Sequence, residues 1–434
     1  MNKSKKAIFG LCILVIGVAV VHYLYSNKIS YPIIRSDGEG YYAYLPALFI
    51  YHDISLHSLV AGPLQGNAPG NTFIWDGTNR YLIIVPSGEA ILMAPFFFLG
   101  WIAQSILGGG EGITGYSSFF QYAAAFSALF YTILGLLILW SVLERYFKQS
   151  TILIVLIGLL FGTDLFHYAT YDSTFSHVYS FFLFSLFLFL VERVYRKGTL
   201  LNFVAFGIVG GLIIITRPSN GLWLLFGILF GISSIRDINE RIKFLKLNWQ
   251  KYLLSLLALV CVLSIQVAYW KVITGSFFVY TYGAEHFNWT KPEILNVLFS
   301  VRKGLFFWAP ILLTVFPGLF FVRKLAKEYF IPILVFFPLN VYVISSWQTW
   351  WYGGSFGQRP FVESIPMFAI ALCALIDGIK PAWGKRILIL AIGLACLLSL
   401  WLMYKYWLRI IPFDHVTWNI LVTTFFKVSK PLHK

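Results

Sequence analysis

Two carboxylates lie close together early in the chain, in the stretch DGEGYY that begins at Asp37. Carboxylates are ordinarily ionised at neutral pH, so Asp37 or Glu39 could act as a general base or hold a metal ion. The structural alternative is a helix cap, because Asp37 could cap a helix that starts near Tyr41. The stretch is the first candidate for chemistry, and Tyr41 and Tyr42 would line a site beside it.

A second group of polar residues surrounds a turn in FGTDLFHYATYDSTFSHVYSFF, which begins at Phe161. Asp164 and His167 stand one helical turn apart, a spacing that suits either a metal pair or a hydrogen-bonded pair. Against a metal site we favour the structural alternative, a buried network whose hydrogen bonds are satisfied. Asp172 and His177 follow in the turn and at the start of the next helix, where they would also line a site.

Cations recur at the ends of apolar segments. Arg217 lies in ITRPSNG, and Arg302 and Lys303 open the stretch RKGLFFWAP. Side chains of this kind can bind a phosphate, or they can extend to the lipid headgroups and anchor the chain. For these three residues the sequence leaves both interpretations open.

An aromatic stretch, SSWQTWWYGGSFGQRP from Ser345, ends near another cation, Arg359. Trp350, Trp351 and Tyr352 would form an aromatic belt at a membrane interface on composition alone. A belt has no need of the inserted GGSFGQR, however. The stretch therefore favours a platform for a sugar or an isoprenoid, with a cation at its edge.

These residues are embedded in a strongly apolar chain. Of its 434 residues, 59% are hydrophobic and only 12% are charged, and the mean hydropathy is +0.76. This composition excludes an ordinary soluble domain and indicates an all-α protein that crosses a membrane many times. The net charge of +15 is spread over short connections, which is typical of cytoplasmic loops and predicts no nucleic-acid partner.

The positions of the basic loops decide how the chain threads through the membrane. If the apolar run 90–107 lies along the outer surface and does not cross, five later basic connections all become cytoplasmic. We therefore predict about eleven transmembrane helices. Their ranges are 7–25, 116–143, 151–171, 175–191, 201–216, 219–235, 252–272, 304–323, 329–346, 361–378 and 387–408.

This topology predicts one membrane domain, 1–408, followed by a short tail, 409–434. The protein would lie in the cytoplasmic (inner) membrane, with its N-terminus in the cytoplasm and membrane lipids around it. The outer loop, 26–115, would carry the acidic motif and juxtamembrane helices, the first of them over 41–51. Because the polar residues named above gather on the outer side, we expect the active site there.

Several motifs together resemble a family of membrane enzymes. The resemblance is to integral-membrane glycosyltransferases of the GT-C fold, within them the glycosyltransferase 39 group of protein O-mannosyltransferases, lipid A aminoarabinose transferases and bacterial relatives. The motifs are the acidic stretch at Asp37, YLIIVPSGEAILMAPFFFLG from Tyr81, SHVYSFF from Ser176, TRPSN from Thr216, RKGLFFWAP from Arg302 and WWYGGSFGQRP from Trp350.

The resemblance implies a GT-C-like helical bundle that transfers a sugar from a polyprenyl-phosphate donor. It also implies that an acidic residue of the first outer loop is the base. Many members have two adjacent acids, whereas Gly38 separates them here; we favour Asp37 over Glu39. A single attack by the acceptor would invert the anomeric centre. The cations that would offset the phosphate charge are Arg217, Arg302, Lys303 and Arg359.

Two other functions fit the same donor class. A transporter or flippase for lipid-linked saccharides would need charges along a central path, and a ligase that joins lipid-linked glycans would depend more on Arg and His. No P-loop or serine-hydrolase motif appears. The acceptor, a glycan, lipid or protein, stays open, as does a divalent metal ion as cofactor; we predict no residues as metal ligands.

Overall fold

The computed structural model describes residues 10, 17, 32–110 and 112–428. Within these residues the regular structure is helical apart from one antiparallel hairpin, in which β1 (Thr72–Ile74) pairs with β2 (Tyr81–Ile83). The predicted all-α architecture is confirmed. The predicted first span, 7–25, falls outside the described residues except at Gly10 and Gly17.

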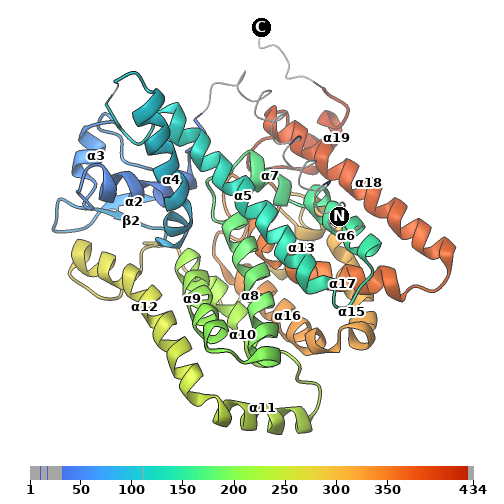
Figure 1. The fold of residues 1–434 in the computed structure, drawn as a ribbon. Helices are drawn as coiled ribbons and strands as arrows, with labels where there is room; N and C mark the ends of the chain where they lie inside the picture. Colours follow the sequence, from blue (N-terminus) through green and yellow to red (C-terminus); the bar gives the residue numbers. More distant parts are fainter. Residues whose placement is uncertain (1–9, 11–16, 18–31, 111, 429–434) are drawn as a thin grey trace.

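The segment after residue 32 builds a small layer on one side of the molecule (Figure 1). It contains α2 (Asp37–Phe49), α3 (His57–Ala61), the hairpin and α4 (Gly88–Leu107). The helix predicted over 41–51 corresponds to α2, which begins four residues earlier. The run 90–107 is helical, as α4, and is long and apolar enough to cross a membrane. Its position along the outer surface stays a prediction.

The next helices cover the predicted ranges 116–143, 175–191 and 201–216, whereas the helical segment in the predicted range 219–235 ends at Leu229. They are α5 (Ser118–Leu143), α6 (Gln149–Gly162), α7 (Leu165–Thr170), α8 (His177–Lys197), α9 (Leu200–Thr216), the 3-10 helix η1 (Pro218–Trp223) and α10 (Leu224–Leu229). The predicted span 151–171 is interrupted, because Thr163 adopts an extended backbone between α6 and α7. This break places Asp164 and the short α7 at one end of α6.

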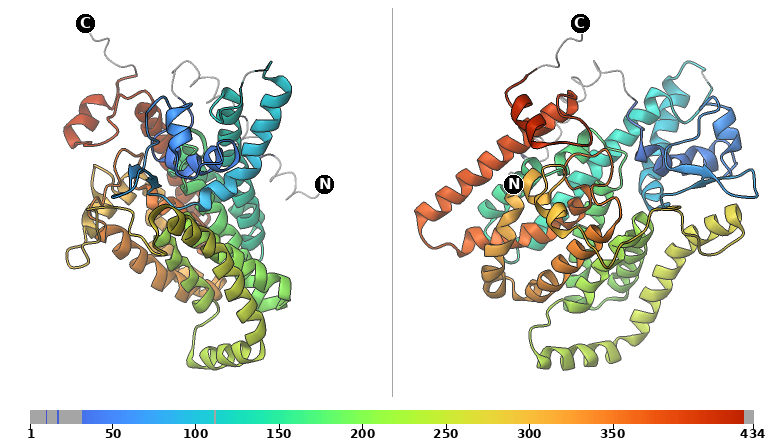
Figure 2. Two further views of the ribbon diagram at one scale, coloured as in Figure 1. Left: turned by 90° about the vertical axis from the view of Figure 1, so that its left-hand side faces the viewer. Right: turned by 180° about the vertical axis from the view of Figure 1, so that it is seen from behind.

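The second half of the chain contains several short helices between its longer ones. Its elements are α11 (Ile235–Leu247), α12 (Trp249–Thr274), α13 (Ile294–Phe299), α14 (Leu305–Trp308), η2 (Pro310–Thr314), α15 (Val315–Leu325), η3 (Lys327–Tyr329), α16 (Phe330–Ser346), η4 (Arg359–Ser364), α17 (Ile365–Gly378), α18 (Ala382–Trp407) and α19 (Trp418–Thr424). Seen from behind, α18 runs along one edge of the bundle, α11 lies across the bottom, and α12 runs from there up toward the opposite side (Figure 2).

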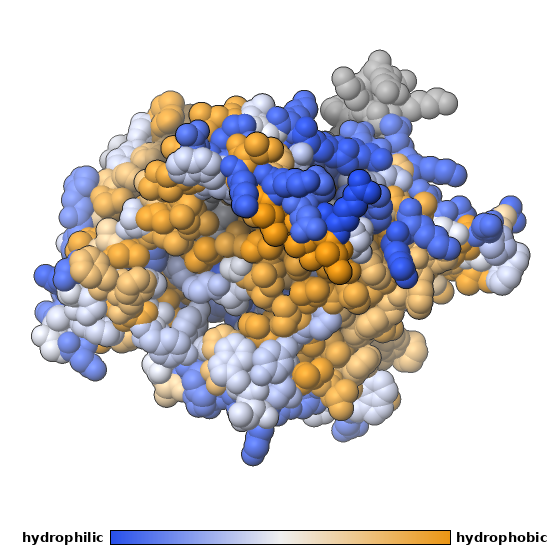
Figure 3. Space-filling model, turned by 90° about the horizontal axis from the view of Figure 1, so that it is seen from below, coloured by the Kyte–Doolittle hydropathy of each residue, from blue (hydrophilic) through white to orange (hydrophobic). Residues whose placement is uncertain are grey.

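Large parts of the surface are apolar, as a protein in lipid requires. In the described residues seven helices are long and apolar enough to cross a membrane, and three further apolar helices are shorter. Most of α12 and α18 is not buried inside the protein, although both are strongly apolar. Figure 3 shows broad hydrophobic areas on the lower face. The chain is an integral membrane protein; the number of eleven spans stays a prediction.

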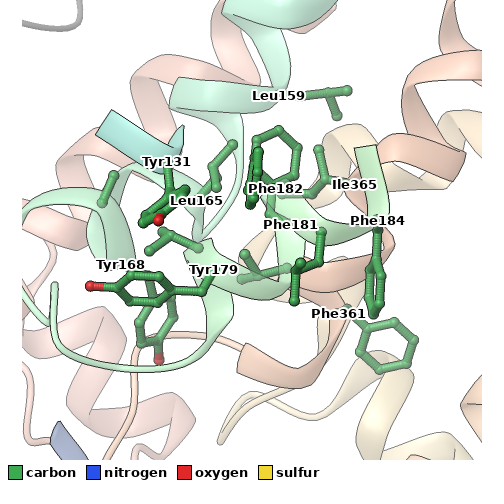
Figure 4. Packing of buried hydrophobic residues seen from close by; sticks show 14 of the residues in the cluster. Tyr131, Leu159, Leu165, Tyr168, Tyr179, Phe181, Phe182, Phe184, Phe361 and Ile365 are labelled. Atoms are coloured by element: carbon green, nitrogen blue, oxygen red, sulfur yellow. The ribbon is translucent and has the colours of Figure 1, made fainter. Parts of the chain in front are cut away.

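Aromatic side chains fill the centre of the bundle between α5, α8 and α17 (Figure 4). The rings of Tyr131 and Phe182 lie 4.8 Å apart, and Phe184 stacks on Trp223 at 4.2 Å. Aromatic pairs at these separations add to the stabilisation from burial alone. This packing fixes the ends of α8 and η4, which carry the polar residues described next.

The segment after residue 408 packs against the bundle. The Lys405 ammonium on α18 donates to the carbonyls of Thr424 and Lys427, and the Trp401 indole donates to the carbonyl of Phe425 at 3.0 Å. These bonds hold α19 beside α18. The segment predicted as a tail is thus a folded part of the molecule as far as residue 428.

Candidate active site

Asp37 is the first residue of α2 and pairs with a cation from the far end of the chain. One carboxylate oxygen lies 2.5 Å from Arg359 Nη1, and the other accepts a hydrogen bond from Asn71 Nδ2 at 3.1 Å. The Asp37 side chain is 29% exposed, and that of Arg359 is 14% exposed. Asp37 can therefore be reached from outside while it stays fixed on two sides.

The two glycines of the acidic motif allow α2 to approach its neighbours closely. A Cβ on Gly38 would overlap the side chain of Thr174, in the turn between α7 and α8. A Cβ on Gly40 would lie 2.7 Å from the carbonyl oxygen of Gly70. Larger residues at either position would push α2 away from the bundle, so these glycines set the position of Asp37.

Glu39, the second acid of the motif, faces another part of the molecule. Its carboxylate accepts a hydrogen bond from the backbone nitrogen of Gly70 at 2.7 Å. That bond anchors the loop before β1. The structure therefore separates the two acids, since Asp37 meets a cation and Glu39 meets backbone.

Three further ionisable residues meet close to Arg359. Glu363, one turn after Arg359 on η4, lies 3.1 Å from His177 Nδ1 and 3.5 Å from Arg217 Nε. Arg217 Nη1 also lies 3.4 Å from His177 Nε2. Burial acts to lower the pKa of Arg217, but the electrostatic effects of Glu363, Tyr41 and Tyr282 together outweigh it and raise that pKa, so Arg217 stays cationic.

Glu89, in the first turn of α4, completes this group. Its side chain is fully buried, and neither carboxylate oxygen has a hydrogen-bond partner among the described residues. It interacts electrostatically with Asp37 and Arg217. We refer to the whole group as the central cluster. Its members are Asp37, Glu89, His177, Arg217, Arg359 and Glu363.

The central cluster contains unused hydrogen-bonding capacity. Besides the two oxygens of Glu89, Arg359 Nε and one oxygen of Glu363 are buried without a partner in the described part of the chain. Buried polar atoms are nearly always satisfied in folded proteins. Three carboxylates here face two guanidinium groups, and the free donors and acceptors can bind the polar groups of a substrate.

A second network lies beside the first and contains Asp172. Arg35 Nη2 lies 3.0 Å from the Asp172 carboxylate, which also contacts His167 Nε2 at 2.9 Å. The Trp407 indole donates to His167 Nδ1 at 2.9 Å, so the ring proton is on Nε2 and is donated to Asp172. Burial opposes ionisation, but His167 and Arg35 outweigh it and lower the pKa of Asp172 to about 2.

No hydrogen bond joins Asp164 to His167, and one Asp164 carboxylate oxygen is buried without a partner in the described part of the chain. Both ring nitrogens of His167 are already engaged, and the Asp164 carboxylate lies where a Cβ on Gly357 would be. No group of three or more His, Cys, Asp or Glu residues in the described ranges could hold a metal ion.

Arg302 and Lys303 have partners of their own. Arg302 makes two hydrogen bonds of 2.8 Å to Asp414, and its guanidinium lies 3.8 Å from the ring centre of Trp351. Lys303 is buried and donates to the backbone carbonyls of Ser355 and Phe413. Burial lowers the pKa of Lys303 to about 7. These two cations hold loops together and do not point at Asp37.

The loop that carries Arg359 is held in place by contacts of the two residues before it, Gly357 and Gln358. Gly357 has a φ of +59°, which favours glycine, and it packs directly on Asp164. Gln358 Nε2 donates to the carbonyl of Trp350 at 3.0 Å. The glycines and the glutamine of GGSFGQR thus shape a turn that points Arg359 at Asp37.

Of the aromatic residues predicted to line the site, some lie at the central cluster and others lie elsewhere. Tyr41 is buried and interacts electrostatically with Arg217 and Glu89, and Tyr352 interacts with Arg217, Arg359 and Glu363. Tyr42 does not join the cluster, because its hydroxyl donates to the carbonyl of Gly115 at 2.6 Å. Trp350 and Trp351 lie with Arg302.

Sequence reasoning missed Glu89, Glu363 and Arg35. A signal was available for the first two, because each is an isolated acid at the start of a long apolar helix, where an ionisable side chain is costly. Arg35 lies only two residues before Asp37. Its partner Asp172 is distant in sequence, and spacing alone could not predict that pair.

Comparisons with known proteins give a fold but no sequence family. No family model matches the chain, and no curated protein matches it either. Among solved structures, the oligosaccharyltransferase of Archaeoglobus fulgidus in its apo form is similar, at 13% identity and a TM-score of 0.52, over 93% of this chain and 55% of that one. ArnT from Cupriavidus metallidurans, solved with undecaprenyl phosphate, is similar at 15% identity and a TM-score of 0.49, over 89% of this chain and 64% of ArnT.

Both similar proteins are glycosyltransferases of the GT-C fold. This chain spans less than two thirds of the length of each. At 13% identity the likeness to the oligosaccharyltransferase shows the fold alone, since one fold can carry different functions. The chain has the GT-C fold, which confirms the fold predicted from its motifs.

Proposed function

We propose that this protein is a membrane glycosyltransferase that moves a sugar from a polyprenyl-phosphate donor to an acceptor on the outer face of the cytoplasmic membrane. The observation that carries the proposal is the contact of Asp37 with Arg359 within the central cluster. A GT-C bundle that presents a reachable carboxylate beside two guanidinium groups suits transfer from an anionic lipid donor.

In this mechanism Asp37 is the general base. Its carboxylate takes the proton of an acceptor hydroxyl or amine while the acceptor atom attacks the anomeric carbon. The bond between that carbon and the phosphate oxygen breaks, and polyprenyl phosphate leaves with the electron pair. One displacement inverts the anomeric centre, and a well-placed base contributes about 10²- to 10⁴-fold to the rate.

The donor phosphate is assigned to Arg359 and Arg217. In the structure each of these cations faces a carboxylate, Asp37 in the first case and Glu363 in the second. A phosphate that engages Arg359 competes with Asp37 for the guanidinium. Donor binding thereby frees the Asp37 carboxylate to accept a proton, so that the base becomes available only when its substrate is in place.

Arg302 and Lys303 act indirectly in this proposal. Their bonds to Asp414, Ser355 and Phe413 keep the loop before Arg359 in position. Glu39 likewise acts on the loop at Gly70 and is not the base. The N-terminus in the cytoplasm and the central cluster on the outer side follow from the distribution of Lys and Arg over the loops.

The test is transfer by purified full-length protein from a panel of synthetic polyprenyl-phosphate sugars. Wild type is compared with Asp37→Asn and with Glu39→Gln, a matched control that can keep the bond to Gly70. Expected is a loss of about 10²- to 10⁴-fold for Asp37→Asn with donor binding retained, and a change below about tenfold for Glu39→Gln. Equal losses in both variants would refute Asp37 as the base.

The same assay separates the alternatives. A transporter or flippase would bind lipid-linked sugar equally well in all three proteins and turn none over. A ligase would transfer glycan chains and depend on His177 or Arg217 more than on Asp37. Dialysis against EDTA, followed by addition of Mg²⁺ or Mn²⁺, tests the divalent ion, which would restore activity if it is a cofactor.

A further inference from the structure

We propose that Glu89 is a second substrate-binding carboxylate, which accepts hydrogen bonds from hydroxyl groups of the sugar that is transferred. This inference rests on the proposed function. It adds a residue that the acid-base mechanism does not require, and it places the sugar ring between α2, α4 and the end of α9.

The first observation is that Glu89 is buried and unsatisfied. Its side chain has 0% exposure, and both oxygens are without partners in the described part of the chain. Removing a carboxylate from water without a compensating bond is strongly unfavourable. Glu89 lies in the first turn of α4, but it makes no hydrogen bond to the free backbone groups there.

The second observation is that close backbone packing fixes where Glu89 sits. A Cβ on the preceding residue, Gly88, would lie 2.5 Å from the backbone nitrogen of Thr216. The start of α4 is therefore pressed against the end of α9, directly before Arg217. The neighbouring Ser87 nitrogen is tied to Gln266 at 2.8 Å. The backbone that carries Glu89 is held from two sides.

The third observation is that Glu89 is associated with both the proposed base and a proposed phosphate-binding cation. Glu89 interacts electrostatically with both Asp37 and Arg217. In an inverting transfer the base and the phosphate lie on opposite sides of the anomeric carbon. Since the start of α4 is pressed against Thr216, the residue before Arg217, Glu89 is placed beside the sugar ring in this mechanism. A carboxylate has two oxygens and can accept bonds from two neighbouring hydroxyls at once.

A purely structural role for Glu89 makes the opposite prediction for stability. A buried carboxylate that holds the fold together is destabilising to remove. Glu192 on α8 is such a residue and serves as a matched control, because it is also fully buried in a long apolar helix. It accepts bonds from Tyr329 at 2.6 Å and Tyr146 at 3.1 Å and pairs with Arg145.

The first experiment compares Glu89→Gln with Glu192→Gln in the purified full-length protein. Without substrate, Glu89→Gln is expected to raise the melting temperature, while Glu192→Gln lowers it. With the preferred polyprenyl-phosphate sugar, Glu89→Gln is expected to lower kcat/KM by about 10- to 100-fold, because a bond to a charged group is lost. Glu192→Gln should leave kcat/KM within about threefold of wild type.

The second experiment uses donors that each lack one sugar hydroxyl. For wild type, a donor that lacks one of the hydroxyls that bind Glu89 should show a clearly lower kcat/KM than the complete donor does. For Glu89→Gln, the same deoxy donor should lower kcat/KM only slightly relative to the complete donor. The inference would be overturned if every deoxy donor lowered kcat/KM by the same factor in wild type and in Glu89→Gln. It would also be overturned if kcat/KM were unchanged in Glu89→Gln.

The two proposals fail in different ways. If wild type and Glu192→Gln transfer sugar and Glu89→Gln is indistinguishable from them, only the role of Glu89 is refuted. If no protein transfers sugar from any donor, the proposed function itself is refuted. Should Glu89→Gln fail to fold, Glu89→Asp keeps the charge, and its deoxy-donor profile then decides the question.

Discussion

Asp37 and Arg359 lie 2.5 Å apart, although 322 positions separate them in the chain. The pair joins the start of α2 to the start of η4, and hence the small layer after residue 32 to the main bundle. Arg359 is additionally 5.5 Å from the ring centre of Phe175. The contact therefore brings together the acidic motif, the turn before α8 and the GGSFGQR loop.

Because Asp37 and Arg359 act as one unit, their variants should not be additive. Arg359→Gln and Asp37→Asn are each expected to lower transfer by at least about 10²-fold, and the double variant by little more than either single one. Initial rates of the four proteins with one donor give this double-mutant cycle. A double variant whose loss equals the product of the single losses would show that the two residues act independently.

The phosphate assignment predicts different effects for two arginines. Arg217→Gln removes a cation from the central cluster and should weaken donor binding by about 10-fold or more, because a charged hydrogen bond is lost. Arg302→Gln breaks the pair with Asp414 and should lower the melting temperature instead. Donor KM and thermal unfolding, measured side by side, check this. A larger KM change in Arg302→Gln would move the phosphate to that residue.

Gly38 should tolerate no side chain. Its added Cβ would overlap Thr174, so Gly38→Ala should displace α2 and lower both stability and transfer, with a loss of about 1 to 3 kcal/mol in unfolding free energy. Gly393 in α18 is the control, since a Cβ there meets nothing within 4 Å. Gly393→Ala should be neutral or stabilising, by up to about 1 kcal/mol. Thermal unfolding of both variants in detergent is the measurement.

The network of Asp172 with Arg35 and His167 should make the stability of the protein depend on pH in the acidic range. The pKa of Asp172 is lowered to about 2, so its contribution is complete at pH values above the ordinary range of an aspartate. It is lost as pH falls from about 4 to about 2, and its size is about 2 to 3 kcal/mol. Asp172→Asn should be less stable at pH 7 and should flatten the acid branch of melting temperature against pH. If the curve of melting temperature against pH for Asp172→Asn ran parallel to that of wild type, the lowered pKa of Asp172 would be contradicted.

Several features of this protein could be predicted from its sequence because they depend on local composition. Long apolar runs must become helices in a bilayer, since each backbone polar group has to bond within its own segment. The ranges 116–143 and 201–216 accordingly match α5 and α9 within two residues. Asp37, Arg217, His177 and Arg359 stood out because ionisable side chains are rare in such a chain.

Only the tertiary structure decided which of these residues meet. Asp37 faces Arg359 while Glu39, two residues later, faces Gly70, because α2 is pressed onto Thr174 by a glycine. Arg302 and Lys303 were equal candidates by residue type, yet their side chains end on Asp414 and backbone carbonyls. Ion pairs and helix contacts between distant segments depend on packing in three dimensions, and no spacing along one chain records them.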